Sequence, residues 1–168
     1  LYAATKKSNE LIAHTYSKVH NLNTTGLRFF TVYGPWGRPD MAYFSFASKI
    51  SSESKISVYN NGNMKRDFTY IDDIVDGIKF AMDKNYKCEV FNLGNNKSED
   101  LMDVISILEK SLKMEAKLKK LGMQLGDVKK TFADIDYSTK TLGYSPKISI
   151  NDGIPQFVDW FKDYNNIK

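Results

Sequence analysis

The sequence predicts an α/β fold, because segments with helical and strand periodicity alternate along nearly all of its 168 residues. Hydrophobic residues make up 42% of the chain and aromatic residues 13%, which is enough for a packed core and argues against disorder. The length suits one domain or a large fragment of one. No internal repeat or low-complexity tract interrupts the pattern.

The first two elements are predicted as a helix over residues 3–20 and a strand over residues 27–32. Apolar side chains recur at roughly helical spacing at Ala4, Leu11, Ile12, Tyr16 and Val19. The sequence NLNTTG ends this pattern, and the run LRFFTV that follows is short, apolar and rich in strand-forming residues. The next stretch, YGPWGRPDM, is a loop, since it carries two glycines and two prolines in nine residues.

The middle of the chain is predicted to alternate between helices and strands. Residues 41–52 have a helical pattern, residues 56–60 a strand pattern, and residues 60–67 (NNGNMKRD) the composition of a turn-rich loop. Residues 69–83 form the strongest amphipathic helix of the sequence. Its apolar side consists of Ile71, Ile74, Val75, Ile78 and Met82.

The last part of the chain continues the alternation. A strand is predicted over residues 88–94, and a helix over residues 98–112 with Ser98 as its N-cap and acidic residues in its first turn. Asp72 and Asp73, at the start of the preceding helix, are interpreted in the same way, as capping and compensation of the helix dipole. The remaining predictions are a strand over 117–122 and helices over 138–144 and 151–165.

Composition argues against several classes of partner. The net charge of +4, from 24 basic and 20 acidic residues, is small, and its densest stretches indicate a solvated face rather than a nucleic-acid site. No run of about 18 apolar residues exists, so no membrane span is predicted. His14 and His20 have no carboxylate at ligand spacing, and no metal site is expected. The single cysteine, Cys88, suits a small core residue in a reducing, cytoplasmic setting.

Tyr2 and Lys6 are four residues apart on the first helix, so their side chains share one face. An ammonium group beside a phenol favours the phenolate, which is one way to make a tyrosine usable as a base. Alone, the pair is better interpreted as an ordinary surface pair on a helix. The glycine-rich turn that a dinucleotide-binding chain should carry is missing. The chain is therefore expected to be the C-terminal piece of a longer protein.

Three strings carry a resemblance to a known family: LRFFTVYGPWGRPDMA, NNGNMKRDFTYIDDIVDGI and TFADIDYSTKTLGYSPKISINDGI. Together they resemble the extended short-chain dehydrogenase/reductase family of NAD-dependent nucleotide-sugar epimerases and dehydratases, most of all the UDP-glucuronate 4-epimerases. The resemblance implies the C-terminal part of a Rossmann-like doubly wound sheet plus the smaller nucleotide-sugar-binding lobe. Residues 1–168 would then be the end of the NAD-binding domain, with the Tyr-x-x-x-Lys helix and the following strand, joined to the substrate-binding lobe.

The resemblance also implies an activity and a cofactor. Such enzymes convert UDP-glucuronate to UDP-galacturonate through a 4-keto intermediate, with tightly bound NAD. Tyr2 is similar to the catalytic base, and Lys6 is similar to the lysine that holds the nicotinamide ribose. Tyr33, Gly34 and Pro35 resemble the stretch of backbone that lies near the nicotinamide.

Five further residues resemble substrate-binding positions of the family. Thr31 stands where several relatives carry asparagine, and a small hydroxyl there leaves room for the C6 carboxylate. Arg38 is similar to an arginine near the sugar and its acid group, and Arg66 to one that contacts the UDP diphosphate. Asp127 resembles the acid that holds the uridine ribose. Gln124 falls where galactose-type relatives carry a basic residue.

Each of these positions also has a structural interpretation. Thr31 could be an ordinary β-branched strand residue, Arg38 could cap a loop carbonyl, Arg66 could pair with Asp67, and Asp127 could form a turn after a glycine. The loop residue Trp36 is expected to pack over the substrate or to shield the core.

The function also has alternatives. The parent could epimerise another UDP-hexose or dehydrate a nucleotide hexose. A homodimer formed through the first helix and a role in making acidic sugars for a surface polysaccharide are further expectations of the resemblance. The 168-residue chain alone is expected to be catalytically inactive, a UDP-sugar-binding or dimerising module, with bare edges on the strands at 27–32 and 88–93.

Overall fold

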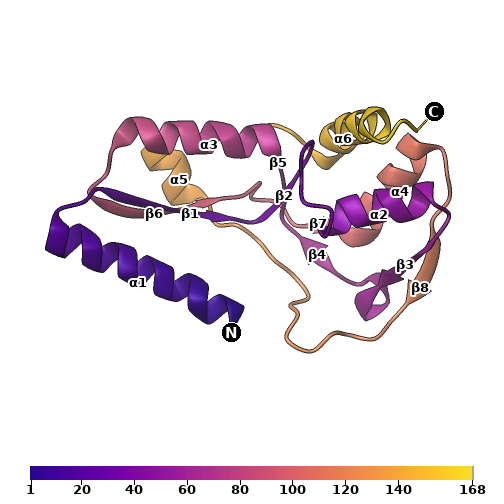
Figure 1. The fold of residues 1–168 in the computed structure, drawn as a ribbon, viewed down its shortest axis with the longest axis horizontal. Coiled ribbons are helices and arrows are strands. Elements are labelled where there is room, and N and C mark those ends of the chain that lie inside the picture. The colour runs from indigo at the N-terminus through magenta and orange to yellow at the C-terminus, as the bar shows by residue number, and fades with distance from the viewer. Residues whose placement is uncertain (168) are drawn as a thin grey trace.

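The structure is a computed structural model that describes residues 1–167, and it divides into two halves along its long axis (Figure 1). In the half that holds the N-terminus, strands β1 (Thr24–Phe29) and β6 (Cys88–Leu93) pair in parallel along their whole length. Helix α1 (Tyr2–His20) lies on one side of this pair, and α3 (Ile71–Lys84) and α5 (Asp136–Leu142) lie on the other. Among the described residues, each strand keeps one edge without a strand partner.

The other half is built from three helices and a second parallel pair of strands. Helix α4 (Leu101–Leu112) contacts both α2 (Ala42–Ser51) and α6 (Ile150–Tyr164). Strand β3 (Lys55–Val58) pairs with β8 (Lys117–Lys120) at the far end of the molecule. Alternation of helices with parallel strands in both halves confirms the predicted α/β class.

Short strands join the two halves. Strand β2 (Thr31–Tyr33) runs parallel to β5 (Phe68–Tyr70), and β4 (Lys65–Arg66) runs antiparallel to β7 (Glu99–Asp100). The 3-10 turn η1 (Tyr59–Gly62) precedes β4. A long segment leaves β8 and returns along the lower side of the molecule in Figure 1 to reach α5.

The strand predicted over residues 27–32 is split at Phe30 into β1 and β2. The N–H of Phe30 donates to the Leu93 carbonyl oxygen at 3.3 Å, whereas the N–H of Thr31 donates to the Asp67 carbonyl oxygen at 3.0 Å. The backbone therefore changes partner within one residue, from β6 in one half to β5 between the halves. A continuous apolar run in the sequence gives no sign of such a switch, because both halves bury apolar side chains.

Each half has its own hydrophobic core. The larger core lies among α2, α4 and α6, where the rings of Phe157 and Tyr43 meet edge to face with centroids 4.8 Å apart. Gly153 in α6 lets β2 approach, since a Cβ there would collide with the Tyr33 hydroxyl. The smaller core lies between the β1–β6 pair and the helices α3 and α5. Its largest buried members are Ile74, Phe91, Leu93, Leu142 and Tyr144.

The predicted helices are all present, with corrections at the starts of three of them. The helix predicted over residues 138–144 is α5, which begins at Asp136 and ends at Leu142. The helix predicted from residue 69 begins at Ile71, because Thr69 and Tyr70 belong to β5. The helix predicted from Ser98 begins at Leu101 with Asp100 at the N-cap position. Ser98 is not a cap, since its hydroxyl donates to the Thr131 carbonyl oxygen at 3.0 Å.

Asp73 has a different role from the predicted dipole compensation. Its side chain is buried, and its two oxygens accept the backbone N–H groups of Lys147 and Ile148 at 3.0 Å each. Asp73 therefore ties the start of α3 to the segment that leads into α6. Asp72 remains exposed in the first turn of α3, where the predicted interaction with the helix dipole is available to it.

The buried tyrosines predict a loss of stability at alkaline pH. Burial raises the pKa of Tyr43 to about 12 and shifts the pKa values of Tyr33 and Tyr144 upward as well. A raised pKa means that the folded protein favours the neutral phenol. The resulting stabilisation of the fold is complete below the usual tyrosine pKa of about 10, and it is lost as the pH rises through the pKa of the folded protein. Absorbance at 295 nm should therefore show tyrosines that ionise only as circular dichroism reports unfolding. Complete ionisation near pH 10 with the fold intact would contradict this prediction.

Candidate functional site

The predicted site residues gather around two neighbouring pockets. One, the Arg66 pocket, has a volume of about 400 Å³, and Thr31, Met41, Lys49, Arg66, Phe68 and Asp127 are among its lining residues. The other, the Gly34 pocket, has a volume of about 600 Å³, and its lining includes Tyr2, Val32, Tyr33, Gly34, Pro35 and Arg38. Met41 lines both, so the two pockets adjoin at the start of α2. Gln124 lies outside both of them.

The loop between β2 and α2 forms one wall of the Gly34 pocket. Gly34 has a φ of 138°, and a Cβ there would collide with the Ile71 side chain, so only glycine fits this turn. The Tyr43 hydroxyl donates to the Gly34 carbonyl oxygen at 3.2 Å. Further along the loop, the Trp36 ring centroid lies 5.3 Å from that of Trp160 in α6. The loop is thus held from both α2 and α6.

Trp36 neither shields the core nor lies buried. Its side chain is exposed, and its ring packs on Trp160 and Tyr164 at the surface of α6. Packing over a substrate remains open to it, because Trp36 also lines the Gly34 pocket.

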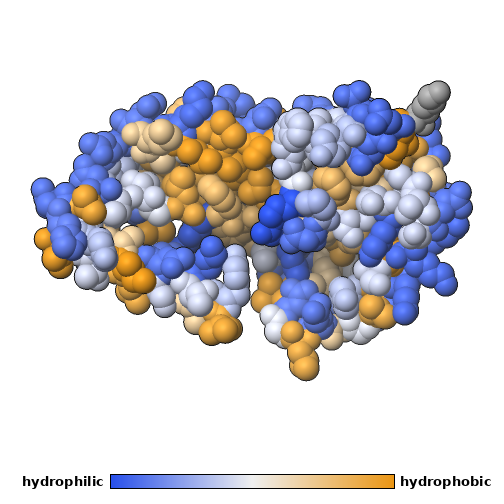
Figure 2. Space-filling model, viewed as in Figure 1, coloured by the Kyte–Doolittle hydropathy of each residue, from blue (hydrophilic) through white to orange (hydrophobic). Residues whose placement is uncertain are grey.

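Tyr2 and Lys6 share one face of α1, as their spacing predicts. The Lys6 ammonium nitrogen lies 5.6 Å from the Tyr2 ring centroid, and both side chains are exposed. Tyr2 lines the Gly34 pocket, and both residues line a groove of about 550 Å³ between α1 and β1. The outline of the molecule has a notch beside the N-terminal end of α1 (Figure 2). The phenol is therefore open to a ligand in the Gly34 pocket.

The side chain of Tyr33 faces the larger core, although Tyr33, Gly34 and Pro35 are all predicted to lie near the nicotinamide. Its side chain is buried, and its hydroxyl donates to the Ser149 carbonyl oxygen at 3.1 Å, toward α6. Burial raises the pKa of this phenol. The hydroxyl of Tyr33 is thus part of the core, which leaves the backbone of residues 33–35 as the part of this stretch suited to meet a ligand.

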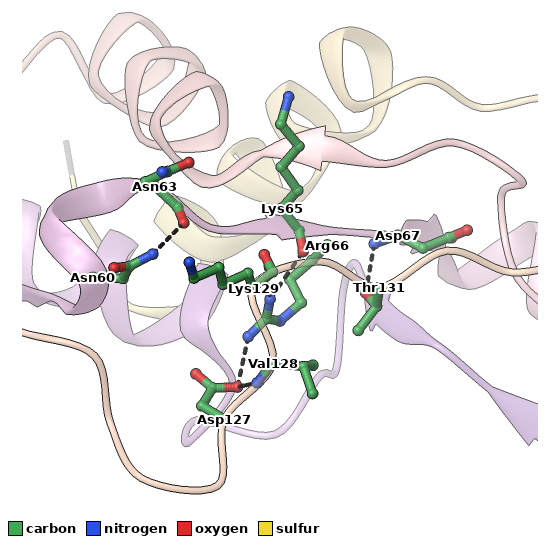
Figure 3. A network of polar contacts seen from close by, with 9 residues as sticks. All are labelled: Asn60, Asn63, Lys65, Arg66, Asp67, Asp127, Val128, Lys129 and Thr131. Carbon is green, nitrogen blue, oxygen red and sulfur yellow. Dashed lines mark hydrogen bonds and ion pairs between the residues drawn. The ribbon is translucent and has the colours of Figure 1, made fainter.

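Arg66 and Asp127 form an ion pair at the rim of the Arg66 pocket (Figure 3). The Arg66 guanidinium donates to the Asp127 carboxylate at 2.7 Å and to the carbonyl oxygens of Lys65 and Lys129 at 2.9 and 3.4 Å. The alternative in which Arg66 pairs with Asp67 is wrong, because the Asp67 side chain is fully buried and Arg66 points the other way. Arg66 is thus held beside the pocket with its charge partly exposed to it.

The segment that carries Gln124 and Asp127 is anchored on both sides of its exposed middle. Before it, the Leu121 N–H donates to the Val58 carbonyl oxygen at 2.9 Å. After it, the Lys65 N–H donates to the Lys129 carbonyl oxygen at 2.8 Å. Between these anchors Gln124 is exposed, and its carbonyl oxygen accepts the Asp127 N–H at 3.3 Å. The segment thus brings Asp127, but not Gln124, to the pocket.

Arg38 is only weakly restrained in the structure. Its side chain is exposed, and its nearest charged partner is the equally exposed Asp40 at 3.4 Å. Such surface pairs contribute little stability, so the guanidinium is free to turn toward a ligand. Thr31 lies at the start of β2 on the wall of the Arg66 pocket, half-buried, with its backbone N–H held by Asp67.

Sequence reasoning missed Asp67 and Met41. Asp67 is buried and accepts hydrogen bonds from the backbone of Asn95 and Ala133. In the sequence, only its position directly after Arg66 distinguishes Asp67. An acidic residue next to an arginine suggests an ion pair rather than a buried acceptor of backbone hydrogen bonds. Met41 lies between the pockets because α2 starts there, which no local pattern reveals. Among residues 1–167, no three His, Cys, Asp or Glu side chains could hold a metal ion, and no helix could cross a bilayer.

Residues 1–94, more than half of the chain, match the NAD dependent epimerase/dehydratase family. The chain therefore belongs to this family. The match covers α1, the loop beside Gly34, β4, β5 and α3, so it includes most of the walls of both pockets.

The chain is similar to particular members of the family. It is 55% identical over 161 residues to an uncharacterized protein of Methanocaldococcus jannaschii, covering 96% of this chain and 49% of that protein. It is 46% identical over 181 residues to UDP-glucuronate 4-epimerase 4 of Arabidopsis thaliana, covering 98% of this chain and 41% of the relative. The chain thus spans about half the length of the curated relatives it matches.

A solved structure has the same fold over nearly the whole chain. The UDP-glucuronic acid 4-epimerase of Bacillus cereus, in complex with UDP-glucuronic acid and NAD, matches with a TM-score of 0.90 and 36% identity. The match covers 97% of this chain and 52% of that one. The arrangement of strands and helices described above is therefore that of the corresponding half of a Rossmann-type epimerase.

The Arg66–Asp127 pair should stabilise the fold more than an exposed pair does. Its side chains are 19% and 33% exposed, compared with 54% and 70% for Lys117 and Glu53, which pair at a similar 2.8 Å. A double-mutant cycle with alanine variants should give a coupling free energy of about 0.5–1 kcal/mol for Arg66–Asp127 and less for the exposed pair. Denaturant unfolding measures both. Equal coupling energies would contradict the prediction that the Arg66–Asp127 pair stabilises the fold more than the exposed pair does.

Proposed function

We propose that the whole protein is an NAD-dependent nucleotide-sugar 4-epimerase that interconverts UDP-glucuronate and UDP-galacturonate. The observation that carries the proposal is the meeting of the two pockets at Met41, with Tyr2 on one and Arg66 on the other. A base and a phosphate-binding cation at opposite ends of one continuous site suit a substrate with a reactive sugar and a diphosphate. The names of the plant and Bacillus cereus relatives support the choice of UDP-glucuronate.

The residues around the Gly34 pocket fit a nicotinamide cofactor. Residues 33–35 line this pocket, and their backbone is suited to contact a flat ring. The turn that places this backbone requires glycine at position 34, because a Cβ there would collide with the Ile71 side chain. Lys6, one helical turn from Tyr2, is placed to hold the ribose. NAD, when bound, would accept a hydride from the sugar and return it.

Tyr2 is the proposed general base. Its exposed phenol lines the Gly34 pocket, and the Lys6 ammonium lies on the same helix face, 5.6 Å from the centre of the Tyr2 ring. Acting as a base, Tyr2 would take the proton of the sugar 4-hydroxyl while the C4 hydride leaves for the cofactor. Tyr2 would give the proton back to the same oxygen when the hydride returns to the other face of C4. Oxidation and reduction cancel over the cycle, so the cofactor is unchanged at the end.

The Arg66 pocket is the proposed place of the UDP moiety. The Arg66 guanidinium, already on the pocket wall, binds the diphosphate, and Asp127 binds the uridine ribose. Thr31 and Arg38 take the C6 carboxylate, Thr31 through its hydroxyl and Arg38 by turning away from Asp40. Gln124 would reach the nucleotide only if its segment moved, since it lies outside the pocket in this structure.

The presence of a separate core in each half supports a separate role for each half. We assign the half with α1, β1, β6, α3 and α5 to the end of the NAD-binding domain, and the half with α2, α4 and α6 to the substrate-binding lobe. The proposal also includes a homodimer through α1, whose exposed face carries Leu11, Ile12, Tyr16 and Val19. A cytoplasmic enzyme that supplies acidic sugars for a surface polysaccharide completes the proposal.

Proton NMR of UDP-glucuronate incubated with the full-length protein tests the reaction. We expect the C4 signal of the galacturonate product to appear with the wild type. Tyr2→Phe should lower the rate by about 10²–10⁴-fold, the usual contribution of a general base. Tyr137→Phe, which also removes an exposed phenol but lies on α5, is the matched control and should keep the wild-type rate.

Three results would count against parts of this proposal. Full activity of Tyr2→Phe would remove Tyr2 from the chemistry. Turnover of UDP-glucose but not of UDP-glucuronate would keep the family reaction and overturn the roles given to Thr31 and Arg38. If no nucleotide sugar turns over, a UDP-sugar-binding module becomes the better description.

A further inference from the structure

Asp67 is a fully buried acid at the junction of β4 and β5. Its Oδ1 accepts the Asn95 N–H at 2.7 Å and the Thr69 hydroxyl at 3.1 Å, and its Oδ2 accepts the Ala133 N–H at 3.0 Å. No lysine or arginine forms an ion pair with it among residues 1–167. A buried carboxylate is costly unless such donors surround it, so these three contacts hold the segments that supply them.

The backbone of Asp67 makes two further connections. Its carbonyl oxygen accepts the Thr31 N–H at 3.0 Å, which fixes the start of β2. Its own N–H donates to the Thr131 hydroxyl oxygen at 3.1 Å (Figure 3). One residue thus joins β2, the segment after β6 and the segment that follows Asp127. The residues of the Arg66 pocket that are assigned to the substrate lie next to these connections; they are Thr31, Arg66 and Asp127.

The segment from Asp127 to Ala133 runs beside β4 and is held at both ends. At one end Asp127 meets the Arg66 guanidinium, and at the other the Ala133 N–H meets the Asp67 carboxylate. In the middle the Thr131 N–H donates to the Lys65 carbonyl oxygen at 3.2 Å. Gly94 makes this close packing possible, because a Cβ there would collide with that of Ala133. A shift at Ala133 would therefore be transmitted to Asp127.

We propose that Asp67 is a positioning residue of the Arg66 pocket. Its carboxylate fixes the 131–133 segment and, through it, the place of Asp127 relative to Arg66 and Thr31. The inference rests on the proposed function, in which a nucleoside diphosphate spans these three residues. A carboxylate is required because every group around it donates a hydrogen bond. An amide of the same shape would direct its NH2 group at the N–H of Ala133 or Asn95.

The experiment compares Asp67→Asn with Asp73→Asn in the full-length protein. Asp73 is the matched control, since it is also buried and also accepts two backbone N–H groups, at 3.0 Å each, but it lies outside both pockets. Calorimetry at a temperature where both variants are folded measures their affinity for UDP. Asp67→Asn should bind UDP about tenfold more weakly, as expected for loss of a buried hydrogen bond to a charged group. Asp73→Asn should stay within about twofold of the wild type.

Amide hydrogen exchange and steady-state kinetics distinguish a positioning role from a general loss of stability. Amide hydrogen exchange at residues 95 and 133 should be faster in Asp67→Asn and unchanged in Asp73→Asn, and the KM for the UDP-sugar should rise more than kcat falls. Should Asp67→Asn fail to fold, Thr131→Val removes the hydroxyl that accepts the Asp67 N–H. That variant should also weaken UDP binding.

The outcomes separate this inference from the function on which it rests. A wild-type protein that does not bind UDP overturns the proposed function, and hydrogen exchange at residues 95 and 133 then decides whether Asp67 holds its segment. Wild-type affinity in Asp67→Asn, or in Thr131→Val where that variant is needed, overturns the positioning role. Equal losses in Asp67→Asn and Asp73→Asn would mean that Asp67 acts only through overall stability, which also overturns it.

Discussion

The change of strand partner at Phe30 is the constraint on which the rest of this structure depends. Up to Phe29 the chain pairs with β6, and from Thr31 it pairs with β5. Because the β1–β6 pair lies in one half and the β2–β5 pair lies between the halves, a single peptide marks the boundary between the two hydrophobic cores. At the boundary between the two cores the sheet is not continuous, so backbone N–H and C=O groups there need other hydrogen-bond partners. Polar side chains such as that of Asp67 supply them.

The site follows from this boundary. Thr31 is the first residue after the switch, and the loop that begins at Gly34 ends where α2 starts, at Met41. Asp67 faces Thr31 across the boundary and supplies the acceptors that the returning segment at Ala133 requires. The Gly34 pocket is lined by Tyr33 and Tyr43 of the larger core and by Phe30 and Val32, which pack against the smaller one. The Arg66 pocket is lined by residues of the larger core, such as Phe68. A long ligand with two chemically distinct ends fits such an arrangement.

Local patterns were sufficient for the helices and for the longer strands, but not for the short strands β4, β5 and β7 or for the junctions between elements. The amphipathic pattern at 71–82 defines α3 because one face packs on the sheet, and the spacing of Tyr2 and Lys6 predicts their shared face on α1. The split at Phe30, the change of role at Ser98 and the burial of Asp67 depend on segments 30 to 70 residues away in the chain. No window of local sequence contains those partners. Arg66 and Asp127 were found through family resemblance, whereas their contact with each other came only from the fold.

The central claim is that the two pockets form one site for a nucleotide sugar. A crystal structure of the full-length protein with UDP-glucuronate tests it most directly. We expect the diphosphate to lie within hydrogen-bonding distance of the Arg66 guanidinium and the sugar 4-hydroxyl to lie beside the Tyr2 phenol. The ligand should pass Met41 between these two positions. A diphosphate bound elsewhere, with Arg66 unchanged on Asp127 and the Arg66 pocket empty, would contradict it.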